Sequence, residues 1–82
     1  MTKFPLAIMR RDVDNYTMYI FNKIAHLVTP YASSIILEYD VDLGYIIKIT
    51  TPIPRVVAAL LLDEGYQIYV GLRKNEVIVD LL

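Results

Sequence analysis

The sequence predicts a two-layer α+β domain in which two helices cover one face of an antiparallel sheet. Two segments, 34–50 and 66–82, alternate apolar and polar residues with the two-residue period of strands, and each contains its own turn. The segment 13–28 instead carries apolar residues at the three- and four-residue spacing of a helix. The segment 51–65 has prolines near its start and a glycine at its end, as a second helix would. A chain of 82 residues is expected to form a single domain, 1–82.

The first hairpin can be predicted in detail. Gly44 supplies the positive φ that the end of a three-residue loop requires. That loop predicts a register in which Leu37 pairs with Ile49 and Glu38 lies directly opposite Lys48. A slip of one residue would exchange the two faces of the sheet, so the pattern specifies the faces strongly.

The second hairpin repeats this arrangement. With Lys74 and Asn75 at its tip, Leu72 is expected to pair with Val77, which again collects the aliphatic side chains on one face. Each hairpin follows a helix, so the chain contains a faint helix-strand-strand repeat.

The segment 4–10 allows two interpretations. Pro5 suits the first turn of a helix, whereas Asp12 and Asp14 are good N-cap residues and indicate that the helix begins later. As a strand, the segment gives the element order of the ferredoxin-like βαββαβ fold with an extra C-terminal strand, and both helices then lie on one sheet face. If the segment instead belongs to the first helix, the element order of the chain is αββαββ, which we keep as the alternative.

The composition favours self-association. Hydrophobic residues make up 56% of the chain, compared with about 45–50% in typical globular proteins. A domain of this size buries only about 60–65% of its unfolded surface, so apolar surface is expected to remain outside its core. We therefore expect a homo-oligomer, with a dimer as the simplest form.

The net charge and the amino-acid composition exclude several classes of function. The net charge of −1 argues against general coating of DNA, and the absence of cysteine excludes disulfides and thiolate metal sites. The apolar run before Arg10 is too short to cross a membrane, so a cytoplasmic protein without membrane contact is expected. Abundant Ile, Tyr and Val without Cys or Trp resembles the composition of thermophile proteins.

Three arginines form a candidate anion site. In a ferredoxin-like arrangement Arg10, Arg11 and Arg55 would meet at two helix N-termini, where an anion could bind between them. The alternative is that Asp12 and Asp14 neutralise the first two arginines on the surface. A small anionic ligand is therefore one candidate partner.

No residue pattern indicates catalysis, a metal or a cofactor. Glu38, Asp40 and Asp42 share a strand face, but Lys48 beside Glu38 is expected to make this a solvated polar face and not a cation site. His26 is the sole histidine, so the chain cannot provide a multi-histidine metal site. We predict a protein that is not an enzyme.

Two surfaces are candidates for subunit contact: the sheet face opposite the helices, and the outer side of the second helix. The predicted contact residues are Ile36, Ile46, Tyr69 and Ile78 on the sheet and Ala58 and Leu62 on the helix. The alternative function is binding of RNA or single-stranded DNA, through the same sheet face with Tyr69 and Lys48 or through the edge that carries Arg10, Arg11 and Arg55. The favoured function is a small interaction module that forms homodimers.

Overall fold

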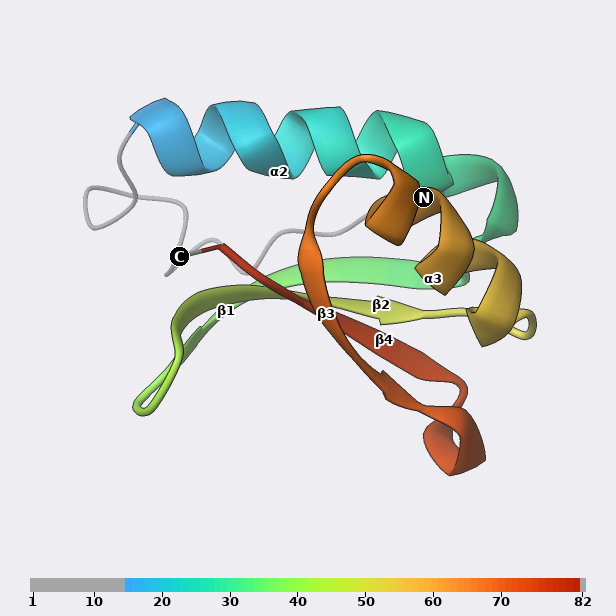
Figure 1. Ribbon diagram of the computed structural model, residues 1–82. Helices are drawn as coiled ribbons and strands as arrows, with labels where there is room; N and C mark the ends of the chain where they lie inside the picture. The colour runs from blue at the N-terminus through green and yellow to red at the C-terminus, as the bar shows by residue number, and fades with distance from the viewer. Residues whose placement is uncertain (1–14, 82) are drawn as a thin grey trace.

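The computed structural model describes residues 15–81, which form two helices and a four-stranded sheet (Figure 1). The elements are α2 (Asn15–Val28), β1 (Ser34–Asp40), β2 (Gly44–Thr50), α3 (Pro54–Asp63), β3 (Gln67–Gly71) and β4 (Glu76–Asp80). Short 3-10 helices, Thr29–Tyr31 and Leu72–Lys74, follow α2 and join β3 to β4. No helix within this part of the chain is long and apolar enough to cross a membrane.

All neighbouring strands are antiparallel, and the order across the sheet is β1-β2-β4-β3. Both helices cover the same sheet face (Figure 1), which confirms the two-layer α+β prediction. The ferredoxin-like topology is not confirmed, because β4 lies beside β2 where that fold places its first strand. The described elements follow the order αββαββ. The prediction for segment 4–10 lies outside the described residues.

The core lies between the helices and the sheet. Its buried side chains form one cluster: Phe21, Ile24 and Val28 from α2, Val57 and Leu61 from α3, and Ile35, Leu37, Ile47, Ile49, Val77 and Val79 from the strands. The strand residues alternate in sequence, as expected for a sheet that buries one face.

The register of the first hairpin differs from the prediction by two residues. Leu37 pairs with Ile47 and not with Ile49. Because the shift is even, every side chain stays on its predicted face. Glu38 and Lys48 are consequently diagonal neighbours, and their side chains still form an ion pair of 3.2 Å.

The turn chemistry of Asp40 explains this shift. Its Oδ1 atom accepts hydrogen bonds from the backbone N–H groups of Asp42 and Leu43, at 2.8 and 3.0 Å. This side-chain turn closes the loop one residue earlier than predicted, so Gly44 becomes the first paired residue of β2. Gly44 does adopt the predicted positive φ, +82°.

The second hairpin shows the same two-residue difference. Val77 pairs with Val70 and not with Leu72. The loop is longer than the predicted tip, because Leu72–Lys74 form a 3-10 turn that ends at Asn75 in the left-handed region, with φ 53°. Asparagine tolerates this conformation better than most residues.

A buried threonine joins the two helix-strand connections. Thr51 has no exposed surface, and its Oγ1 atom donates a hydrogen bond of 2.6 Å to the carbonyl oxygen of Tyr31. The same atom accepts the backbone N–H of Ile53 at 3.1 Å. The hydroxyl therefore holds the chain before β1 against the entrance of α3. The N-cap position of α3 itself is occupied by Ile53, two residues further on.

Candidate interaction surface

α3 is apolar on two opposite sides, of which the sheet covers one. The seven apolar residues from Val56 to Leu62 extend almost twice around the helix, so they cannot all face the core. The buried residues of the helix are Pro54, Val57, Ala58 and Leu61. On the other side, Val56 is 46% exposed and Leu62 is 59% exposed. The described elements therefore leave one apolar side of α3 uncovered.

The exposed side has a symmetric order of residues. We call it the outer stripe of α3, and it consists of Arg55, Val56, Ala59, Leu62 and Asp63. Successive helix residues are about 100° apart, so the outer residues lie within about 60° of Ala59 on either side. Arg55, Val56, Ala59 and Asp63, together with Leu60, line a shallow hollow.

Each charged residue of the outer stripe lies at the end of α3 where the helix dipole disfavours its charge. Arg55 is in the first turn of α3 and Asp63 is its last residue, and the helix has no acidic residue in its first turn and no basic residue in its last. Each such placement costs about 0.3–1 kcal/mol at an exposed helix end. Neither side chain makes an ion pair within residues 15–81. A partner with the opposite order of charges would relieve both conflicts.

Three of the four predicted contact residues on the sheet are less accessible than the outer stripe. Ile46 is only 4% exposed, although it faces away from the helices, since Glu38 and Asp80 flank it as its direct cross-strand partners. Ile36 and Ile78 are half-buried. Tyr69, on the edge strand β3, is the exposed member of this group, at 50%.

The two predicted helix residues differ from each other. Ala58 is 8% exposed and packs on the core side of α3, whereas Leu62 belongs to the outer stripe. The candidate anion site cannot be assembled from the described residues: Arg55 is exposed at the start of α3, and Arg10 and Arg11 lie outside the described residues.

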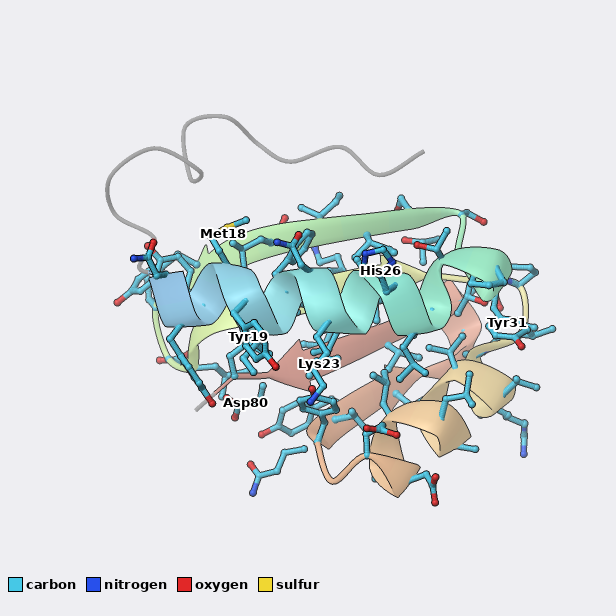
Figure 2. All side chains as sticks on the ribbon, turned by 90° about the horizontal axis from the view of Figure 1, so that it is seen from above. Met18, Tyr19, Lys23, His26, Tyr31 and Asp80 are labelled. Atoms are coloured by element: carbon cyan, nitrogen blue, oxygen red, sulfur yellow. The ribbon has the colours of Figure 1, made fainter. Side chains whose placement is uncertain are left out.

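A separate hollow lies near the C-terminal ends of the two helices. Its lining residues are Lys23, His26, Leu27, Glu64 and Tyr66. Lys23 extends from α2 on the side of α3 (Figure 2). No ion pair joins Glu64 to Lys23 or His26 within the described part of the chain. Charge of both signs therefore meets here on an open surface.

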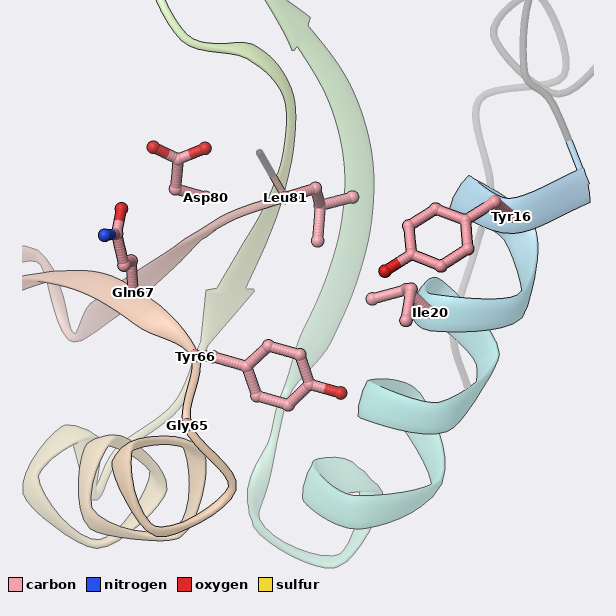
Figure 3. A pocket seen from close by; sticks show the side chains of 7 residues that line it. All are labelled: Tyr16, Ile20, Gly65, Tyr66, Gln67, Asp80 and Leu81. Atoms are coloured by element: carbon pink, nitrogen blue, oxygen red, sulfur yellow. The ribbon is translucent and has the colours of Figure 1, made fainter.

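A third cavity, of about 280 Å³, was not predicted from the sequence. Figure 3 shows the hydroxyl groups of Tyr16 and Tyr66 directed into it, from α2 and from the residue that precedes β3. Its other lining residues are Ile20, Gly65, Gln67, Asp80 and Leu81. No pattern in the sequence could have indicated it, because its walls come from three elements whose rotations are set by packing. No group of three or more His, Cys, Asp and Glu side chains within residues 15–81 is arranged to hold a metal ion.

Comparison with known proteins adds no relative: no protein-family model, curated protein or solved structure matches the chain significantly.

Proposed function

We propose that this protein is a small interaction module that forms a homodimer through the outer stripe of α3 and has no catalytic role of its own. The observation that supports this function is the pair of large aliphatic side chains, Val56 and Leu62, that remain about half exposed on a short helix. Apolar side chains gathered on one side of an element, between polar residues, are typical of protein interfaces.

The energy available from this surface is moderate. Full burial of a Val or Leu side chain contributes about 1.5–3 kcal/mol relative to an exposed one, and these side chains are already half covered. α3 has ten residues, so it is only about 15 Å long. The contact is expected to fall at the small end of specific interfaces, with weak and concentration-dependent association.

Sedimentation equilibrium over a series of protein concentrations tests this function. The expected result is a mass that rises from that of the 9.4 kDa chain toward twice this value. Leu62→Ser should shift the transition to higher concentration, because it removes a large apolar side chain from the contact.

Tyr19→Ser is the matched control for this substitution. Tyr19 is 61% exposed on the solvent side of α2 (Figure 2), so its exposure is close to the 59% of Leu62 while its position differs. It should leave the association unchanged. A further variant, Tyr69→Ser, tests the open sheet face. If Tyr69→Ser abolished the association and Leu62→Ser did not, the sheet and not α3 would be the interface.

A further inference from the structure

The outer stripe of α3 is complementary to itself. Arg55 and Asp63 lie four positions before and after Ala59, and Val56 and Leu62 lie three positions before and after it. We infer that the second copy binds in the antiparallel direction, with a twofold axis beside Ala59 and with Arg55 of each protomer facing the partner's Asp63. This inference rests on the proposed self-association and specifies its geometry.

A twofold axis perpendicular to a helix brings each residue before the axis level with the partner's residue that lies equally far after it. With the axis at Ala59, Val56 lies level with the partner's Leu62 but on the opposite edge of the contact, so the two aliphatic side chains flank the paired Ala59 residues on either side. Ala59 meets its own copy at the axis. Its small side chain allows the two helices to approach to the lower part of the usual range of about 8–10 Å.

Charge complementarity selects the antiparallel direction. Two Arg–Asp pairs would form, one at each end of the contact, and each would place an acidic group near a helix N-terminus and a basic group near a C-terminus. These are the groups that α3 lacks in its own first and last turns. A parallel arrangement would instead bring Arg55 against Arg55 and Asp63 against Asp63, which is repulsive.

Charge reversal tests this geometry directly. In Arg55→Asp both end contacts become Asp–Asp, and in Asp63→Arg both become Arg–Arg. Each single variant should associate about tenfold more weakly than the unchanged chain or worse, since two favourable pairs become two unfavourable ones. An equimolar mixture of the two variants restores both pairs, so it should form a heterodimer with close to the original affinity. The double variant Arg55→Asp/Asp63→Arg should also recover a homodimer.

Loss of folding cannot imitate this result. Both reversals place the charge that the helix dipole favours at each end of α3. At concentrations where the chain is monomeric, each single variant should therefore melt at the same temperature as the original chain or higher. Glu64→Arg is the matched control, because Glu64 is adjacent to Asp63 but lines the hollow near Lys23. It should leave the association unchanged.

The outcomes separate this geometry from the proposed function. If the original chain dimerises while the mixture associates no better than the single variants, the antiparallel geometry is wrong and self-association stands. The same conclusion follows if Arg55→Asp and Asp63→Arg dimerise as well as the original chain. A chain that stays monomeric at every concentration overturns both.

Discussion

Thr51→Val isolates the contribution of one buried hydroxyl to stability. Valine has nearly the shape of threonine, so no cavity forms at this fully buried position. The substitution removes the hydrogen bond to the Tyr31 carbonyl and the one from the Ile53 N–H. A buried group without its partner costs about 1–3 kcal/mol. Both of these bonds are partly buried, so we expect a total loss of about 2 kcal/mol, in the middle of that range.

Urea denaturation followed by far-UV circular dichroism measures this change, at a concentration where the chain is monomeric. A loss of about 2 kcal/mol corresponds to a fall in Tm of roughly 8–16 °C for a domain of this size. Thr29→Val is the matched control. Thr29 is the exposed first residue of the 3-10 helix that follows α2, and its hydroxyl donates a hydrogen bond to the Ala25 carbonyl oxygen. Its substitution should cost about 0.5 kcal/mol or less.

A Thr51→Val variant as stable as the original chain would contradict this prediction. That result would mean that water or a backbone adjustment replaces the hydroxyl, so that the two connections do not depend on it. An equal loss in Thr51→Val and Thr29→Val would also contradict it, because the loss would then come from the side-chain change and not from burial.

Two further predictions concern the first hairpin. Gly44→Ala should destabilise the protein by about 1–2 kcal/mol in thermal denaturation, because the residue at this position has a positive φ. The control Gly71→Ala should change stability by about 0.5 kcal/mol or less, because φ is ordinary there and the new Cβ would meet only one atom, at 3.9 Å. Equal effects of the two substitutions would argue against the turn geometry. Lys48→Ala should cost about 0.2–1 kcal/mol by removing the partly exposed ion pair with Glu38, and a loss that stayed the same at high salt would contradict this electrostatic origin.

The sequence predicts the faces of the sheet better than the register of its strands. Alternation alone determines which side of a strand is apolar, so Leu37 and Val77 were placed on the core side correctly. The exact pairing depends on where each turn closes. That was decided by a side-chain hydrogen bond from Asp40 and by a 3-10 turn before Asn75, neither of which leaves a strong signal in the sequence.

The accessibility of the candidate surfaces was only partly predictable. The unbroken apolar run in α3 indicates that the sheet leaves one side of this helix uncovered, and Leu62 is indeed exposed. The burial of Ile46 could not be foreseen, because it depends on the polar side chains of two neighbouring strands. The symmetric order around Ala59 is visible in the sequence only after the structure shows which side of α3 faces the core.

Disulfide trapping at the proposed axis tests the central claim most directly. The chain contains no cysteine, so Ala59→Cys introduces a single thiol in the middle of the outer stripe. Cα atoms must come within about 7 Å for a disulfide to form without backbone movement. Under mild oxidation we predict a covalent dimer for Ala59→Cys that forms much faster than for Asn22→Cys, which places an exposed thiol on α2. Equal rates of cross-linking for the two variants would contradict dimerisation through the outer stripe of α3.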